Sequence, residues 1–452
     1  MATLRDLLRE LIEELIKTQT PGSFPEKVDG VTVMSGFIST GQGGSLMLSR
    51  PMEQLISQIA QILRQNAPTV FLSHTEKEWL QLVRGAFGPP LALIDLTDDL
   101  GSNADQVLAA VRQTLSESTV KGSTCEYAFG CTLFASKAVE AFAIGPVRFE
   151  ARLEWLARKL GEGAVTAIMA RRLRRRWAGQ KNRKRKHLVD GMRETDIVDA
   201  VGSCDYICSV MTGGLASQAG EMKSRTAARL ALTAIAIWWE VPSRALDGMN
   251  LLVDRTVRIQ RSLAFVPGKI TLSGGTLLGR PHGPPISPKE WADLLARVGD
   301  ELKVVGELIE FYLSPTGAVG RPKLMNALAQ ALLWFHEGCR EQVDLMAIVK
   351  FAATLDALAS GGESSGILKL IQARLGPKPS DPIRANGQTA KQGVEEIYSK
   401  GRSRTMHGTN ENLGHDWTST RGFSEVIARY CLISCLGWAA TNASDDPKLL
   451  LQ

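Results

Sequence analysis

Apolar residues recur every three to four positions along much of the chain, which is the spacing of amphipathic helices. The first such stripe predicts a helix over residues 3–18, with Thr3 as its N-cap. Ser49-Arg50-Pro51 predicts the start of a second helix, because a polar cap followed by proline is a helix start signal. Two short apolar runs follow, residues 70–72 and 91–94, and we interpret them as candidate strands.

The middle of the chain mixes both kinds of pattern. Aromatic residues within 125–150 favour strands, and Gly145-Pro146 marks a turn between two of them. A helix is predicted next over residues 153–169. Residues 190–260 are predicted to be mainly helical. Residues 262–285 become β-like and then rich in Gly and Pro, which we interpret as a loop and a domain boundary.

From Pro322 onward the pattern predicts an all-helical bundle. The expected helices cover residues 324–339, 343–359, 367–375, 388–400 and 423–440, after one or two helices within 288–312. We therefore predict a mainly α fold, in which a mixed α+β N-terminal region precedes a C-terminal helical bundle. The expected divisions are a mixed α/β domain (1–150), a mainly helical middle region with a basic run (151–310) and a helical bundle (311–452).

Composition narrows the class of protein. With 452 residues the chain is long enough for two or three domains, and 44% hydrophobic with 22% charged residues is typical of a soluble globular protein. No apolar run is long enough to cross a bilayer, so no membrane partner is expected. The first residues are charged and amphipathic, unlike a signal peptide. Seven sparse cysteines fit a reducing compartment, which predicts a cytoplasmic protein.

The net charge of +6 comes from one segment. Residues 171–186 hold ten Lys and Arg and no acid, and the rest of the chain has 43 Lys and Arg against 47 Asp and Glu. Such a patch is the footprint expected for a polyanion, although a solvated helix or loop is the plain alternative. The candidate nucleic-acid-binding residues are Arg171, Arg172, Arg174, Arg175, Arg176, Trp177, Lys181, Arg183, Lys184, Arg185 and Lys186, of which Trp177 could stack on a base.

The most informative stretch is residues 398–408, Tyr-Ser-Lys-Gly-Arg-Ser-Arg-Thr-Met-His-Gly. Arginine offers a fixed fork of donors for a phosphate, and histidine gives or takes a proton near neutral pH. Together they are the minimum set for breaking a phosphodiester without a metal ion. The candidate catalytic residues are Arg402 and His407, with Tyr398, Ser403, Arg404 and Gly408 in supporting roles.

The spacing of these residues resembles the Arg-polar-x-x-x-His signature of the HEPN superfamily, and the ApeA-like branch fits best. In one respect it departs from that branch, because Tyr398 lies four residues before Arg402 where three are expected. The resemblance covers about the last 130 residues. It implies a homodimer whose two Arg/His sets share one cleft, and cleavage of RNA, for example tRNA or mRNA, without metal or cofactor.

The same resemblance implies a bacterial antiphage or toxin role. We hypothesise that residues 1–310 sense a trigger or hold the nuclease inactive, and a regulatory partner or a phage trigger is a further candidate partner. The alternative is a non-catalytic HEPN dimer that binds a nucleotide or a nucleic acid.

Residues outside the motif are weaker candidates for a functional site. Two cysteine pairs, Cys204 with Cys208 and Cys431 with Cys435, have the spacing of one helix face, but buried small hydrophobes are the better interpretation, so no metal is predicted. His415 and Asp416 are weak candidates for the same cleft, and His336 is expected to pack in a helix.

Overall fold

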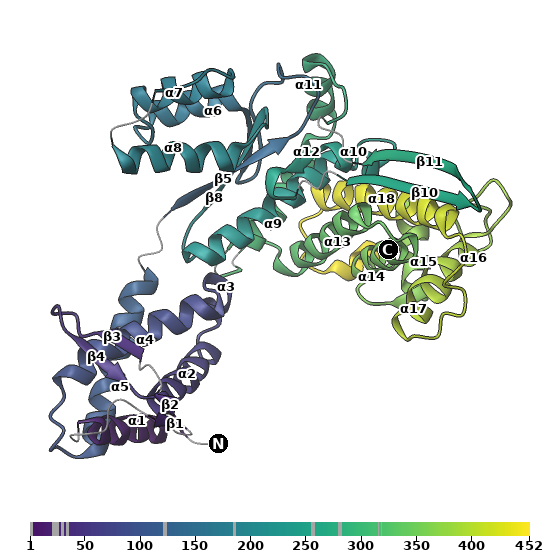
Figure 1. Cartoon of the computed structure of the whole chain (residues 1–452). Coiled ribbons are helices and arrows are strands. Elements are labelled where there is room, and N and C mark those ends of the chain that lie inside the picture. The colour runs from purple at the N-terminus through teal and green to yellow at the C-terminus, as the bar shows by residue number, and fades with distance from the viewer. Residues whose placement is uncertain are drawn as a thin grey trace. The chain divides into compact units, whose positions relative to one another are not determined.

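The structure is a computed structural model that describes the chain apart from residues 1–2, 20–26, 29–30, 33–35, 121–123, 184–186, 255–257, 279–282, 315 and 318. Two compact units form (Figure 1). Unit 1 contains Met1–Cys125, Thr212–Met222 and Ser314–Gly317, and unit 2 contains Glu126–Met211, Lys223–Leu313 and Ala318–Gln452. The first stretch of unit 1 ends at Cys125 and not near the expected position 150, because the residues that follow form strands of a sheet in unit 2.

Unit 1 is built from helices and short hairpins. Its elements are α1 (Leu4–Thr18), β1 (Lys27–Val28), β2 (Val31–Thr32), β3 (Gly36–Ser39), β4 (Ser45–Leu48), α2 (Arg50–Gln65), α3 (Pro68–Ser73), α4 (Glu76–Leu93) and α5 (Leu100–Val120). Helices α1, α2, α4 and α5 pack pairwise around one apolar core. The two predicted helix starts are confirmed, because Thr3 forms a capping box with Asp6 and the Ser49 hydroxyl accepts from the Met52 N–H.

The two candidate strands of unit 1 are wrong. Residues 70–72 lie in α3, which begins at Pro68, and residues 91–93 end α4. A Thr75–Glu78 capping box starts α4, whose helix continues through Pro89 and Pro90. A run of three or four apolar residues has no period of its own, so it cannot distinguish a buried helix from a strand.

The sheet of unit 2 has the strand order β6-β7-β8-β5-β9. Its strands are β5 (Cys125–Thr132), β6 (Phe142–Ile144), β7 (Val147–Ala151), β8 (Tyr206–Thr212) and β9 (Asn250–Leu251). The strands predicted within 125–150 are confirmed, including the turn at Gly145-Pro146. Strand β8 contradicts the helical prediction for 190–260. It lies inside the sheet and is buried on both faces, so it reads as a continuous apolar run without alternation.

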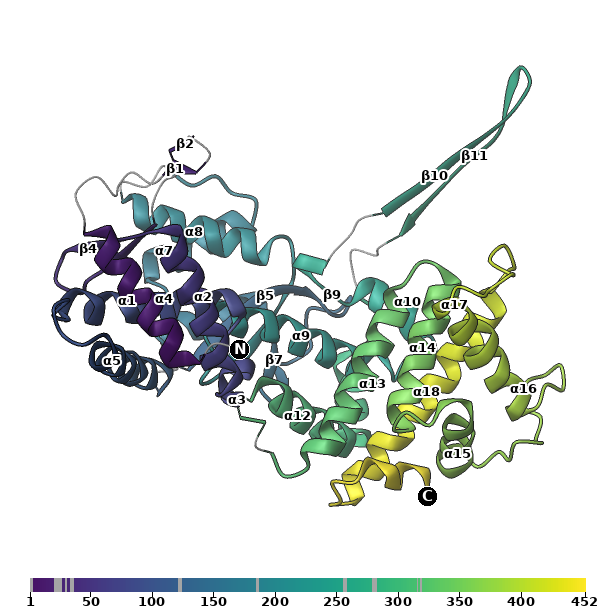
Figure 2. The same ribbon diagram turned by 90° about the horizontal axis from the view of Figure 1, so that it is seen from below.

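Helices and one hairpin follow the sheet strands along the chain. They are α6 (Arg152–Gly161), α7 (Ala167–Trp177), α8 (Leu188–Val201), α9 (Ser217–Ala236), α10 (Pro242–Gly248), the 3-10 turn η1 (Leu252–Asp254), β10 (Arg258–Val266), β11 (Lys269–Leu278) and α11 (Pro288–Arg297). The single helix expected over 153–169 is two helices, α6 and the start of α7. The Gly-rich residues 273–275, expected in a loop, lie in β11, which pairs antiparallel with β10 as a long ribbon (Figure 2).

The C-terminal bundle is confirmed. It consists of α12 (Gly299–Leu313), α13 (Pro322–Arg340), α14 (Asp344–Leu358), α15 (Glu363–Leu375), α16 (Ala390–Val394), the π-helix η2 (Glu395–Ser403), α17 (Arg404–Met406), α18 (Thr418–Thr441) and the 3-10 turn η3 (Pro447–Leu451). Helix α14 lies at its centre and packs against α13, α15, α18 and the π-helix. The predicted mainly α fold, with a mixed α+β region before a helical bundle, is therefore confirmed.

One bundle helix has the composition of a membrane span. Among the described residues α18 alone is long and apolar enough to cross a bilayer, and α14 with α15 qualifies only as a pair bent by 70°. Helix α18 packs against α12, α13 and α14, and its residues Ile427, Cys431, Leu432 and Leu436 are buried in the shared core. The apolar residues of α18 therefore serve the packing of the bundle.

Candidate functional site

The Arg/His motif lies on a stretch of π-helix. Helix α16 begins with a capping box between Thr389 and Gln392, and α geometry gives way to π geometry at Glu395. The Arg404 N–H donates to the Ser399 carbonyl, five residues back, which is the π-helical bond. π-Helices are rare, and where they occur they are frequent at functional sites. The regular helix expected over residues 388–400 is thus replaced by α16 and a wider turn that carries the motif.

Contacts to two other helices hold the π-helix in place. Gly401 is buried against Ile348 of α14, so closely that a Cβ atom would lie 2.6 Å from the Ile348 side chain. The Glu396 carboxylate accepts hydrogen bonds from Thr420 of α18 and from Gln388, and forms an ion pair with Arg384. Burial alone would raise the pKa of Glu396, but these hydrogen bonds lower it below its ordinary value. Glu396 is therefore ionised at neutral pH and anchors the segment.

The Arg402 guanidinium is oriented by two partners. Its Nη1 donates to the Tyr398 hydroxyl at 2.6 Å, and its Nη2 lies 3.6 Å from a carboxylate oxygen of Asp356 on α14. The guanidinium also lies 4.8 Å from the centre of the Tyr398 ring. A π turn contains one residue more than an α turn, and the tyrosine four residues before the arginine reaches it within this turn.

Tyr398 keeps its proton at neutral pH. Burial and the Asp356 carboxylate raise the pKa of Tyr398 above its ordinary value, while Arg402 acts against them. Because the hydroxyl oxygen accepts from Arg402, its own proton remains available for another acceptor. The Arg402 side chain is 33% exposed, whereas Tyr398 is buried, so the guanidinium is the member of the pair that reaches the surface of the bundle.

His407 lies beyond the end of α17, as its C-cap, and is exposed. Its backbone N–H donates to Ser403, and Gly408 follows with a positive φ of 70° that ends the helix. No hydrogen bond or ion pair joins Arg402 to His407 in the described chain. Ser403 is half-buried and Arg404 is exposed, and neither side chain bonds to Arg402 or His407. The structure thus gathers Tyr398 and Arg402, and leaves the imidazole open to solvent.

The two weaker candidates near the motif have local contacts. The Thr418 side chain, and then its N–H, which donates a hydrogen bond to Asp416, lower the pKa of Asp416 at the start of α18. The exposed His415 ring packs edge-on against Trp417 at 5.1 Å. Both contacts support the loop that leads into α18.

Arg402 opens into a surface hollow of about 580 Å³, which we call the Arg402 hollow. It is lined by Lys323, Asn326, Ala327, Gln330, Trp334, Ala353, Asp356, Ala357, Ser360, Gly361, Arg402 and Pro447. One wall is an outward stripe of α13 that ends at Trp334, and another is the C-terminal end of α14. The sequence prediction missed this wall. The sequence does contain a signal for it: Trp334 follows Lys323, Asn326 and Gln330 at helical spacing, so an aromatic residue lies on an otherwise polar stripe.

The basic segment forms part of α7 and the loop after it. Arg172 is bound by the buried Glu194 of α8 through its Nε at 2.9 and 3.0 Å, and donates to the Arg183 carbonyl. The Asn182 side chain donates to the Arg172 carbonyl, so the loop folds back on α7. The result is a hollow of about 400 Å³, whose cationic lining is Arg172, Arg176, Lys181 and Arg183.

The other candidates of this segment differ in their surroundings. Arg171, Arg174 and Arg175 are exposed, and Lys184, Arg185 and Lys186 lie outside the described residues. Trp177, expected to stack on a base, is half-buried and packs on the small core that includes Leu173, with Arg152 at 4.9 Å from its ring. Trp177 therefore helps to fasten α7 to its own core.

The cysteine pairs are packed. Cys208 lies in β8, so the expected helix spacing with Cys204 does not exist, while Cys431 and Cys435 share α18. All four are buried, and burial raises the pKa of Cys435 to about 12. The interpretation as small core residues is confirmed. Over the described residues no group of three His, Cys, Asp or Glu side chains is placed to hold a metal ion.

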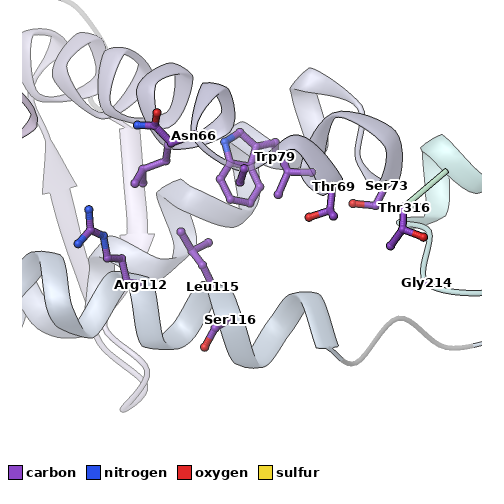
Figure 3. Close-up of a pocket in the computed structure, with 12 residues that line it drawn as sticks. Asn66, Thr69, Ser73, Trp79, Arg112, Leu115, Ser116, Gly214 and Thr316 are labelled. Carbon is purple, nitrogen blue, oxygen red and sulfur yellow. The ribbon is translucent and has the colours of Figure 1, made fainter. Parts of the chain in front are cut away.

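Unit 1 contains a separate hollow of about 560 Å³ (Figure 3). Its walls are mainly apolar, with Trp79 and Leu115 among them, and polar groups of Asn66, Thr69 and Arg112 border it. The Trp79 indole N–H donates to the Ala60 carbonyl, so that side chain is fixed. Apolar walls with a few polar groups are typical of a small-molecule site.

Comparison with known proteins adds no relative. No family model matches the chain, and no curated protein and no solved structure matches it either. The assignment of function therefore depends on the residues and contacts of this chain.

Proposed function

We propose that the chain is a HEPN-type endoribonuclease that cleaves RNA without a metal ion, with Arg402 and His407 as its catalytic residues. The single observation that carries the proposal is the π-helix, which presents Arg402 in a surface hollow while Tyr398 and Asp356 hold it. This is an unusual backbone with an oriented cation, which fits recognition of a phosphodiester better than a structural role.

The chemistry follows from the charges that develop. The RNA 2′-hydroxyl loses its proton and attacks the phosphorus, and the 5′-oxygen leaves with a proton, which gives a 2′,3′-cyclic phosphate. Arg402 binds the non-bridging oxygens as they gain negative charge, a contribution worth about 3–4 kcal/mol. His407 transfers a proton at the attacking or the leaving oxygen, worth roughly 10²–10⁴-fold in rate. The buried Tyr398 hydroxyl accepts from Arg402 and so positions the guanidinium for this contact.

Two copies complete the site in this proposal. Arg402 is turned toward Tyr398 and Asp356, and no bond joins it to His407 within one chain. A homodimer through the bundle would bring two Arg/His sets to one cleft, as the motif's resemblance implies. RNA docks on the cationic hollow of α7, where each phosphate contact releases counterions and makes binding dependent on salt.

The proposed setting is bacterial antiphage defence or a toxin system in the cytoplasm, with residues 1–310 sensing or regulating. It follows from the same resemblance. Expression in bacteria tests it, because the wild-type chain should arrest growth and His407→Ala should not. Equal growth with both proteins, at equal expression and under phage infection, would contradict the setting.

The decisive experiment is incubation of the full-length protein with labelled RNA in EDTA. We expect cleavage that survives chelation, leaves a cyclic phosphate and is lost in Arg402→Ala and His407→Ala. Lys391→Ala is the matched control, because it removes an exposed cation of α16 that has no role in the proposed site. Unchanged cleavage by His407→Ala refutes the assignment. Tight nucleotide binding without cleavage would instead support a non-catalytic binding module.

A further inference from the structure

Helix α13 presents one polar stripe to solvent. Lys323, Asn326, Gln330 and Trp334 follow each other at three or four residues, and all four side chains are exposed. Residues at this spacing lie on one face of a helix. The same four residues line the Arg402 hollow, so the stripe and the motif border one space.

Trp334 is the unusual member of this stripe. It is 43% exposed, although the next residue along the helix, Phe335, is fully buried. Two other tryptophans near the surface are covered by cations, Trp177 by Arg152 and Trp438 by Arg374. No such cation and no aromatic ring covers Trp334 among the described residues. A large indole therefore offers an open face inside a hollow that also contains a guanidinium.

The remaining lining fits a nucleic-acid strand. Arg402 and Lys323 are cations suited to phosphate, and the amides of Asn326 and Gln330 can donate to and accept from the edges of bases. The one carboxylate, Asp356, already pairs with Arg402 and accepts from the Glu363 N–H. The stripe from Lys323 to Trp334 is about 16 Å long at 1.5 Å per residue. Stacked nucleotides rise by about 3.4 Å each, so a short single strand fits along it.

We propose that the Arg402 hollow binds an unpaired segment of RNA, with one base stacked on Trp334 and an adjoining phosphodiester at Arg402. The inference rests on the proposed function and names its substrate class, because a base inside a duplex is stacked on its neighbours and cannot reach an indole on a helix surface. Trp334 is then a specificity-determining residue that selects single-stranded sites.

The test measures binding of the full-length protein to a short 2′-O-methyl RNA, which lacks the attacking hydroxyl and cannot be cleaved, as a single strand, as a duplex and with one base removed. Stacking of one base on an aromatic side chain corresponds to about a 10-fold to 100-fold loss of affinity on replacement by alanine. We expect that loss for Trp334→Ala with the single strand, little loss for Trp334→Phe, and no change with the duplex. Tyr430→Ala, which removes an exposed aromatic of α18 outside the hollow, should bind like the wild type.

The RNA that lacks the stacked base should bind the wild-type protein and Trp334→Ala equally, which would locate the stacked nucleotide. Unchanged affinity in a folded Trp334→Ala, or an equal loss with single strand and duplex, overturns the inference. If cleavage still depends on Arg402 and His407, the proposed function survives that result. If RNA binding needs Trp334 but cleavage continues without Arg402 and His407, the proposed function fails and the binding site remains.

Discussion

We expect His336 of α13 to make the folded protein sensitive to mild acid. Its ring is buried in the core of unit 2, with its Nδ1 2.8 Å from the Thr233 hydroxyl. That hydroxyl donates its only proton to the Arg229 carbonyl, so the imidazole donates to it from Nδ1. Burial, then the nearby Arg340 and Arg229, lower the pKa of His336 from 6.5 to about 3, and Asp254 offsets part of this.

The magnitude follows from proton linkage. Between pH 6.5 and pH 3 the unfolded chain binds a proton on His336 that the folded chain excludes. The contribution of the neutral ring to stability is therefore complete above pH 6.5 and is lost as the pH falls. At about 1.4 kcal/mol per pH unit, the free energy of unfolding should fall by roughly 2 kcal/mol between pH 7 and pH 5 because of this residue.

The assay is urea unfolding of the wild type and His336→Gln between pH 7.5 and pH 5, followed by far-UV circular dichroism. Glutamine keeps a donor for Thr233 and does not titrate. His74, whose pKa is also lowered by burial, contributes equally to both proteins and cancels in the difference. We expect the wild type to lose about 2 kcal/mol more than the variant over this range. Parallel stability curves for the two proteins would refute the reasoning.

Three further outcomes are expected. Tyr398→Phe removes the acceptor for Arg402 but keeps a ring beneath it, so kcat for RNA cleavage should fall about 10-fold to 100-fold with little change in KM. Gly401→Ala forces a Cβ against the buried Ile348 and should destabilise the protein by about 1–3 kcal/mol in thermal unfolding. Glu126, whose pKa is lowered to about 2, is mainly ionised in the folded state above that pH, so acid titration should show stability being lost as the pH falls from about 4.5 to about 2.

Each of these has its own check. Tyr398→Leu should lose more activity than Tyr398→Phe, and equal rates for Tyr398→Phe and wild type would remove the orienting role. Gly422→Ala is the control for Gly401→Ala, because a Cβ at that position of α18 meets no atom within 4 Å. Glu126→Gln should flatten the acid titration in the stated window; a titration as steep as that of the wild type would contradict the pairing with Arg158 and Lys159.

Local signals were enough to predict much of the helical structure. Thr3 and Ser49 cap the helices that they were expected to cap, and the bundle helices lie within a few residues of their predicted bounds. Strand β8 was missed because its neighbours in the sheet, and not its own pattern, make it a strand. The same limit applies to residues 70–72, which carry too few positions to show a period.

The candidate site, too, was predicted only in part from the sequence. Arg402 and His407 were found from their spacing, but the pairing of Arg402 with Asp356 joins residues that are far apart in the chain. The π geometry depends on contacts of Gly401 and Glu396 with other helices, which no short window of sequence contains. Trp334 could not be assigned to the site from the sequence, because only the folded bundle brings α13 and the motif to one hollow.

The π-helix between Glu395 and Ser403 also determines which way the side chains of its later residues point about the helix axis. Because it takes up one residue more than an α turn, Gly401 faces Ile348, and a residue without a side chain lies where a Cβ atom would come within 2.6 Å of Ile348. Tightening the turn to α geometry would rotate the later residues by about 100°, one residue's worth, and bring Lys400 or Arg402 to that point instead. The number of residues in this stretch is therefore as strictly constrained as their identity, and a one-residue insertion or deletion should be more damaging than most substitutions.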